Sequence, residues 1–226
     1  MKYANIKEGI FIERVNRFIA HIDVDGKVEV CHVKNTGRCK EILVKGCKVF
    51  VQEFDSKIRK TKFDLISVYK GNRLINIDSQ VPNKMFSEWV KLGNLFKDIK
   101  VFKSEVFYKN SRFDFYVEYE DKKAFIEIKG VTLENEGVVL FPDAPTSRGV
   151  KHLKELVSAR EEGYEAYVIF IVQMEGVKYF TSNYETHKEF GDTLSFCKNN
   201  GVNILAFDSV VLKDEIYIKD SVKVLI

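Results

Sequence analysis

SRFDFYV at residues 111–117 and AFIEIKG at residues 124–130 decide the fold of the second half of this 226-residue chain. In both stretches apolar and polar side chains alternate, and a period of two is typical of a strand with one buried face. Phe113 and Phe115 are expected together on the apolar face of the first strand, opposite Asp114. The pattern predicts a hairpin of two antiparallel strands.

The polar faces of these strands carry the residues from which we predict a chemical site. Glu127 and Lys129 share one face of the second strand. A two-residue turn at 120–121 sets Asp114 directly opposite Glu127, whereas a four-residue turn sets it opposite Lys129. Either turn keeps all three side chains on one face, because only a one-residue slip in register would move them apart.

The preceding strand extends the pattern. A turn at residues 109–110 places Glu105 opposite Asp114, so three carboxylates and one lysine are expected on adjacent strands, with neighbouring pairs about 5 Å apart at Cβ. Facing like charges are unfavourable unless a cation compensates them, and carboxylates suit Mg²⁺ or Mn²⁺. We predict Asp114 and Glu127 as metal ligands, and Asp114, Glu127, Lys129 and Glu105 as catalytic residues.

Such a cluster fits phosphodiester cleavage. A bound divalent ion activates water and neutralises phosphate charge, and a neighbouring lysine orients the water or stabilises developing charge. The alternative is an ordinary solvated strand face, on which an E-x-K pair is common.

Residues 1–80 have a different pattern, with short apolar-rich stretches separated by turn signals. Asp25-Gly26 and Gly71-Asn72 are typical hairpin turns. Five or six strands with one short helix at 37–44 favour a small β-barrel, and the OB type is the candidate because it commonly binds oligonucleotides. The strands are expected at residues 10–13, 17–24, 28–33, 48–54, 63–69 and 74–77.

Pro82 and Asn83 mark the expected boundary of a second domain. The continuous apolar run at 164–172 predicts a strand covered on both faces. The expected elements are a helix at 84–95, a meander at 100–141, a helix at 148–162, the strand at 164–172, a helix at 188–199, a strand at 203–207 and a hairpin around 213–214. The chain is thus predicted to be a two-domain α/β protein, with an OB-like β-barrel over residues 1–81 and a mixed-sheet α/β domain over residues 82–226.

Charge is unevenly distributed between these halves. Residues 1–80 hold 16 Lys and Arg against 10 Asp and Glu, a net charge of +6, whereas residues 81–226 hold 20 against 23, a net charge of −3. A basic barrel fits a DNA partner, and no helix-turn-helix or zinc-finger signature indicates base-specific reading. DNA contacts are expected from two groups of cations: Lys34, Arg38 and Lys40, and then Lys57, Arg59, Lys60 and Lys62.

Four other residues have two interpretations each. Phe54 and Phe63 could stack on bases, although core packing is favoured. His152 could reach a phosphate near the metal or simply lie at the start of a surface helix, and Gln173 could line the same pocket.

Composition narrows the class of protein. Hydrophobic residues make up 45% and charged residues 31%, which is typical of a globular chain. No uncharged apolar run approaches the ~18 residues of a membrane helix, and the first residues lack the layout of a signal peptide. The four cysteines fit neither a disulfide framework nor a zinc site. We expect a cytoplasmic protein with no membrane partner and no small-molecule cofactor, of undetermined oligomeric state.

Six ungapped blocks in fixed order resemble the sugar fermentation stimulation protein A family. They are CHVKNTGRC (31–39), RKTKFDLI (59–66), NIDSQVPN (76–83), NSRFDF (110–115), EIKGVTLE (127–134) and FPDAPTSRGVKHL (141–153). The resemblance implies a DNA-binding protein with an N-terminal OB-like barrel and a C-terminal domain similar to the PD-(D/E)xK nucleases. In that nuclease pattern Asp114 is the aspartate, Glu127 and Lys129 are the E-x-K pair, and Glu105 is the upstream acid. Phe113 stands where the pattern has proline.

Two functions remain open. The first is a largely sequence-nonspecific DNA-binding protein with an active Mg²⁺-dependent nuclease site. The second is a non-catalytic DNA-binding regulator of sugar (maltose) metabolism with a vestigial nuclease site, which the family name favours. An OB-type RNA-binding module is a weaker third interpretation.

Overall fold

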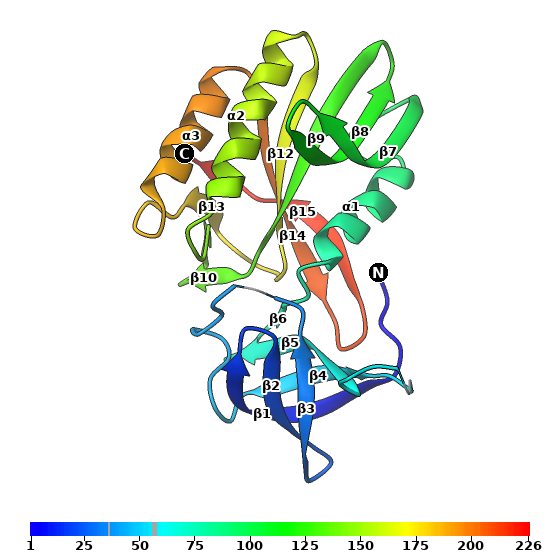
Figure 1. The fold of residues 1–226 in the computed structure, drawn as a ribbon, viewed down its shortest axis with the longest axis vertical. Coiled ribbons are helices and arrows are strands. Elements are labelled where there is room, and N and C mark those ends of the chain that lie inside the picture. Colours follow the sequence, from blue (N-terminus) through cyan, green and yellow to red (C-terminus); the bar gives the residue numbers. More distant parts are fainter. Residues whose placement is uncertain (36, 56–57) are drawn as a thin grey trace.

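The structure, a computed structural model, describes residues 1–35, 37–55 and 58–226. Its first part is a β-barrel, at the bottom of Figure 1. The barrel strands are β1 (Ile6–Asn16), β2 (Ile19–Val24), β3 (Lys27–Val33), β4 (Lys48–Glu53), β5 (Phe63–Lys70) and β6 (Arg73–Asn76).

Pairing of β3 with β5 closes the barrel. The strands follow the order β3-β2-β1-β4-β5-β6, and the parallel β3–β5 contact joins the far ends into a closed barrel of five strands, β1 to β5. Cys31, Val33 and Leu65 on these two strands point inward and are buried. Closure removes free strand edges, and the predicted OB-like barrel is confirmed.

The helix expected at 37–44 is absent from the described residues of that segment. Cys39 instead accepts hydrogen bonds from the Ile42 and Leu43 amides, and only turns form. These three side chains are buried in the barrel core, so tertiary packing rather than helix propensity shapes the segment.

The second part is a mixed α/β domain. Its main sheet has the order β15-β14-β12-β9-β8-β7, with β12 parallel to both β9 and β14 and the other pairs antiparallel. These strands are β7 (Ile99–Tyr108), β8 (Ser111–Tyr119), β9 (Lys122–Val131), β12 (Glu165–Val172), β14 (Asn203–Val211) and β15 (Ile216–Ser221). The predicted two-domain fold with a mixed sheet is confirmed.

Helices cover both faces of this sheet. Val168 and Phe170 of β12 pack in one apolar cluster with Leu153 of α2 (Ser147–Glu161) and Leu194 of α3 (Lys188–Asn199). Ile169 and Ile171 pack in a second cluster with α1 (Val81–Lys91). The strand at 165–172 is therefore covered on both faces, as its apolar run predicts.

A second, small sheet lies beside the main one. It consists of β10 (Leu133–Asn135), β11 (Val138–Phe141), β13 (Tyr179–Ser182) and β16 (Val224–Leu225). Sequence reasoning placed the first two in one meander and missed the others, because strands of two to four residues carry almost no periodic signal. In the chain as described, no helix is long and apolar enough to cross a membrane.

The first residues of the chain lie against the second domain. The Tyr3 amide donates to the Asp214 carbonyl at 2.8 Å. The backbone of Lys2 pairs with that of Glu215, in the β14–β15 hairpin, as an isolated antiparallel β-bridge. Figure 1 shows this segment running from the hairpin and α1 down to the barrel. Residues 2–3 thus lie against the sheet domain, the barrel strands follow, and the chain then re-enters the sheet domain at α1.

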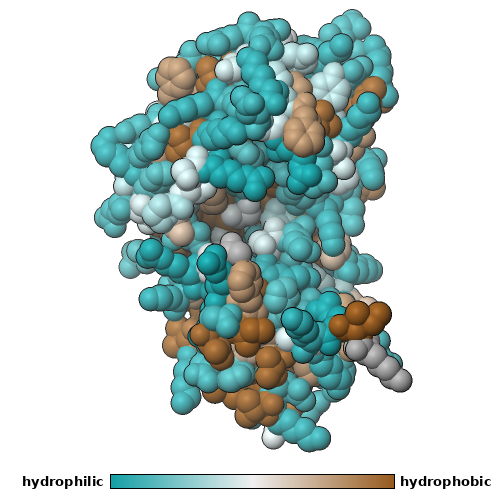
Figure 2. All heavy atoms as spheres, viewed as in Figure 1, coloured by the Kyte–Doolittle hydropathy of each residue, from teal (hydrophilic) through white to brown (hydrophobic). Residues whose placement is uncertain are grey.

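The outer face of the barrel is partly apolar. Val28 is 65% exposed, and Phe18 and Val30 are also exposed on or beside its strands. Figure 2 shows brown side chains gathered over this end of the molecule. Exposed cations lie both on its strands, at Lys27 and Lys48, and in its loops, at Arg38, Lys40 and Lys60.

Candidate functional site

The predicted hairpin forms in the two-residue-turn register. Phe115 pairs with Ile126 and Val117 with Ala124, which confirms the tight turn at 120–121. Beyond the Phe115 pair the ladder ends, and the Ile128 amide donates to Asp114 Oδ2 at 2.7 Å. The Asp114 carboxylate therefore ties β8 to β9 at the point where the two strands part.

The side-chain alternation changes at the same point. Phe113 packs with Phe125 and His152 on the α2 side of the sheet, whereas Phe115 contacts Phe86 of α1 on the other side. The prediction that Phe113 and Phe115 share one face is therefore wrong. The departure of β8 from the ladder breaks the regular pleat between them.

Asp114 also receives a hydrogen bond from the start of α1. Asn83 Nδ2 donates to Asp114 Oδ1 at 2.7 Å. Asn83 was assigned to the domain boundary, but α1 begins at Val81, so Asn83 lies in its first turn. Sequence reasoning missed this contact, since it joins positions 31 residues apart.

Glu127 is nearly inaccessible, and its two oxygens have different surroundings. Oε1 accepts from Lys129 Nζ at 2.5 Å and lies 2.6 Å from His152 Nδ1. Oε2 is buried and has no hydrogen-bond partner among the described residues. A buried carboxylate oxygen without a partner is costly, so Oε2 is an unsatisfied acceptor in the candidate site.

The two carboxylates differ in their tendency to ionise. Burial raises the pKa of Asp114, and the negative charge of Glu127 adds to this, against the Ile128 amide and Lys129. Burial alone would also raise the pKa of Glu127, but the hydrogen bond to His152 and the charge and hydrogen bond of Lys129 outweigh it and hold that pKa below its usual value. Glu127 is therefore the firmly ionised partner.

The donor set fits a hard divalent cation. Asp114 and Glu127 supply carboxylate oxygens, the unpartnered Oε2 among them, and Mg²⁺ typically uses one or two carboxylates together with water and phosphate. The structure reveals no group of three or more His, Cys, Asp or Glu arranged to hold a metal within the described ranges. A cation bound there would thus need further ligands, such as backbone carbonyls, water or phosphate oxygens, to complete its coordination.

Glu105 does not join the site, which corrects the prediction. Its register is as expected, since Val106 pairs with Phe113 and Ser104 with Phe115. However, its backbone φ is +55°, a left-handed conformation that breaks the side-chain alternation. The Glu105 side chain is 66% exposed and forms a 3.5 Å ion pair with Arg112.

Two of the seven cations expected to contact DNA are held by buried carboxylates instead. Lys34 Nζ lies 2.8 Å from Asp78 and 3.4 Å from Asp64, and Arg59 pairs with the other oxygen of Asp64. Both aspartates are 2% exposed. The structure therefore gives Lys34 and Arg59 a role in the fold, which composition could not reveal.

The remaining cations of this group differ in whether their side chains are paired. Lys62 forms a 2.6 Å ion pair with Glu53. Arg38, Lys40 and Lys60 are exposed, and their side chains form no ion pair or hydrogen bond with any described residue. Lys57 lies outside the described residues.

The structure also shows where the four residues with two interpretations, Phe54, Phe63, His152 and Gln173, lie. Phe63 is 2% exposed and belongs to the barrel core, as favoured, while the Arg59 guanidinium lies 3.9 Å from the ring centre of Phe54. Gln173 is buried and donates to Asn76 Oδ1 at 2.9 Å and to the Asp78 carbonyl at 3.0 Å. Gln173 thus joins the barrel to the end of β12.

His152, only 4% exposed, lies inside the site and not at the surface.

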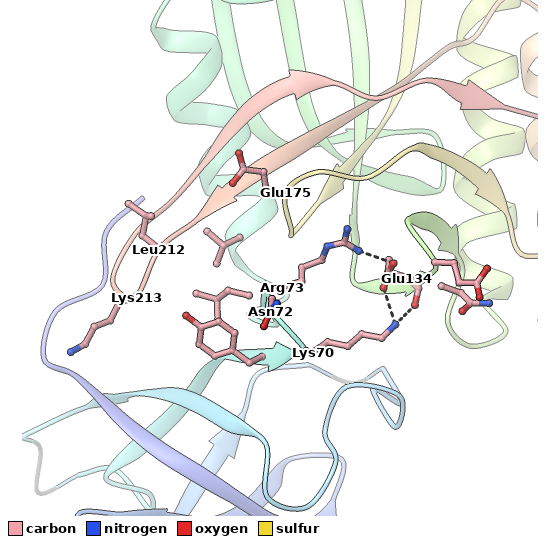
Figure 3. A pocket seen from close by; sticks show the side chains of 13 residues that line it. Lys70, Asn72, Arg73, Glu134, Glu175, Leu212 and Lys213 are labelled. Carbon is pink, nitrogen blue, oxygen red and sulfur yellow. Dashed lines mark hydrogen bonds and ion pairs between the residues drawn. The ribbon is translucent and has the colours of Figure 1, made fainter.

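A wide cleft of about 970 Å³ opens between the domains, away from Asp114 and Glu127. Figure 3 shows Lys70 and Arg73 of the barrel pointing toward Glu134 of β10. Lys70 lies 2.8 Å and Arg73 2.7 Å from its carboxylate, which is 6% exposed and also accepts from the Gly137 amide. These bonds link the two domains, and both Glu134 oxygens are engaged.

Comparison with known proteins identifies the family. The N-terminal OB domain of SfsA matches residues 12–77, and the sugar fermentation stimulation protein RE domain matches residues 80–215. A sugar fermentation stimulation protein homolog from Clostridium beijerinckii is 62% identical over 226 residues, covering 100% of both chains. One from Ruminiclostridium cellulolyticum is 58% identical over 99% of both chains.

A solved structure has the same fold. SfsA of Pyrococcus furiosus, determined in complex with Ca²⁺, is 25% identical, with a TM-score of 0.91 over 100% of this chain and 98% of that one. The agreement extends across both the barrel and the sheet domain. The chain therefore belongs to the sugar fermentation stimulation protein family.

Proposed function

We propose that this protein binds DNA largely without sequence preference and cleaves phosphodiesters at a Mg²⁺ or Mn²⁺ site formed by Asp114 and Glu127. The observation that carries the proposal is Glu127 Oε2, a buried carboxylate oxygen with no protein partner in the described structure, in a site that also contains Asp114. The Ca²⁺ complex of the Pyrococcus furiosus relative supports a divalent cation in this family.

When bound, a divalent cation activates water and neutralises charge on a phosphodiester. The chain's own residues prepare the site. Asn83 and the Ile128 amide fix both oxygens of Asp114. Lys129, 16% exposed and 2.5 Å from Glu127, holds a positive charge beside the two carboxylates, where it would stabilise negative charge that develops on a bound phosphodiester.

DNA would be held mainly by electrostatic attraction. Arg38, Lys40 and Lys60 are the exposed cations of the predicted set that keep their charge uncompensated by described neighbours, in a barrel segment of net charge +6. Phosphate contacts of this kind do not depend on base sequence. This supports binding that is largely indifferent to sequence.

Cleavage of supercoiled, linear and single-stranded DNA with Mg²⁺ or Mn²⁺ tests the proposal. We expect metal-dependent cleavage by the wild type and none by Asp114→Asn or Lys129→Ala. Lys123→Ala serves as the matched control, because Lys123 is an exposed lysine on the same strand, β9. DNA binding should persist in all variants, since Arg38, Lys40 and Lys60 are unchanged.

The second candidate is a non-catalytic DNA-binding regulator of sugar metabolism with a vestigial site. It is favoured by the two donors on Glu127 Oε1, Lys129 and His152, which compensate the buried charge without a metal. DNA binding with no cleavage of any DNA form, and no saturable Mn²⁺ binding, would support it against the nuclease.

A further inference from the structure

We infer that His152 is a positioning residue of the site, which holds Glu127 Oε1 so that Oε2 stays free for a divalent cation. The inference rests on the proposed function. It assigns His152 a task that does not require contact with DNA or metal. The supporting observations are the burial of His152, its 2.6 Å contact with Glu127, and the asymmetric surroundings of the carboxylate.

The helix α2 places His152 at this point. Thr146 caps the helix, and its Oγ1 accepts from the Gly149 amide at 3.0 Å. His152 follows within the second turn, on the face that covers the sheet, and its ring packs edge-on against Phe113 at 6.0 Å between centroids. With 4% exposure, the ring has little room to turn away from Glu127.

The second nitrogen of His152 defines which tautomer fits. Arg148 Nε donates to His152 Nε2 at 3.4 Å, so Nε2 is the acceptor. In a neutral imidazole the proton then resides on Nδ1, and Nδ1 donates it to Glu127 Oε1. His152 is thereby a fixed hydrogen-bond donor, and partners of this kind orient metal-binding side chains in proteins.

A second consequence concerns Lys129. Because His152 and Lys129 share Oε1, Lys129 can move toward a phosphate without leaving Glu127 Oε1 unpartnered. Lys129 is 16% exposed on a side chain with several rotatable bonds, whereas His152 is buried. We assign the permanent contact to His152 and the mobile one to Lys129.

Titration of the full-length protein with Mn²⁺ by calorimetry tests this assignment with two substitutions. His152→Leu fills similar space without a donor. His152→Asn is the matched variant, because Asn Nδ2 occupies nearly the position of His Nδ1 and can donate to Oε1. We expect His152→Leu to weaken Mn²⁺ affinity by about 10- to 100-fold, as loss of such partners does elsewhere, and His152→Asn to retain most of it. Thermal unfolding without metal verifies that both variants are folded.

The outcomes separate this inference from the function on which it rests. Equal Mn²⁺ affinity in His152→Leu and wild type overturns the positioning role while the proposed function stands. Equal loss in the Leu and Asn variants also overturns it, because the donor would then be irrelevant. Absence of saturable Mn²⁺ binding in the wild type overturns the proposed function itself, before any substitution is considered.

Discussion

The barrel pair Asp64 and Asp78 and the sheet-domain pair Asp114 and Glu127 both lie beside cations, but the oxygens of the two pairs are satisfied differently. In the barrel, Arg59 and Lys34 pair with the two oxygens of Asp64. Asp78 accepts from Lys34 at 2.8 Å and from the Gln80 amide at 3.0 Å. In the sheet domain, two donors crowd one oxygen of Glu127, and the other has none in the described structure.

This difference distinguishes a structural charge cluster from a candidate binding site. A fully bonded buried network rigidifies the fold and leaves no oxygen without a partner. A network with one unpartnered oxygen is less favourable for folding but retains binding capacity. Burial and charge alone do not separate the two clusters, whereas the partner of each oxygen does.

The largest effect on stability is expected when the barrel cluster is broken. Asp64→Ala leaves Lys34 and Arg59 without a shared partner, and removal of one member of a buried ion pair typically costs about 3–5 kcal/mol. Because Arg59 is 33% exposed, we expect the lower end of that range in urea unfolding. Glu8→Gln removes a surface pair with Lys48 and should cause no measurable change. Wild-type stability in Asp64→Ala would contradict the structural role.

Asp114→Asn should give the opposite result. Burial and the charge of Glu127 raise the pKa of Asp114, so the ionised carboxylate disfavours the folded state at neutral pH. The Asn83 amide can flip to accept from the new side chain, and the Ile128 bond persists. We expect unchanged or higher stability in urea, and loss of Mn²⁺ binding by calorimetry. A clearly less stable variant would mean that Asp114 is part of a satisfied structural network.

Glu134 provides a third, interdomain test. Burial raises its pKa, but Lys70, the Gly137 amide and Arg73 outweigh this and lower it overall. Its stabilising contribution is therefore present above the unfolded-state pKa and is lost as the pH falls through the folded-state pKa. Glu134→Gln should cost about 2 kcal/mol at neutral pH and flatten the acid side of a stability profile measured by urea unfolding. An unchanged acid limb would show that the pair contributes little.

The smallest effect is expected at the exposed cations. Replacing Arg38, Lys40 and Lys60 by Ala should leave stability unchanged and weaken binding equally to unrelated DNA sequences. The slope of log affinity against log salt should become shallower by about 0.9 for each phosphate that the variant no longer neutralises. Lys45→Ala and Lys27→Ala, at other exposed barrel positions, are controls. Unaltered salt dependence would place the DNA-binding surface elsewhere.

Local pattern predicted the strands of the site and narrowed the register of the second hairpin to two alternatives, of which the structure has the two-residue turn. Alternation in 111–117 and 124–130, with tight turns at 109–110 and 120–121, matches the observed pairings. The pattern could not predict that the Glu105 side chain points away from the site, because the left-handed φ of +55° that moves it does not change the alternation of polar and apolar residues. It also could not predict the change of face between Phe113 and Phe115.

Contacts between residues far apart in the sequence determine the roles of the other predicted site residues. Lys34 and Arg59 look like other exposed cations until the fold brings Asp64 and Asp78 to them. His152 was considered as a phosphate contact or as a surface residue of the α2 start, and its bond to Glu127 spans 25 positions. A histidine in the second turn of a capped helix, on its apolar face, is a signal that could have placed it inside.

The path of the chain through the barrel constrains its movement. Residues 2–3 are held on the β14–β15 hairpin, and residues 77–80 lead back into α1, so two separate connections attach the barrel to the sheet domain. Gln173 and Glu134 also bond the barrel to the sheet domain, so any movement that opens the cleft at Glu134 must break these bonds while both chain connections stay in place.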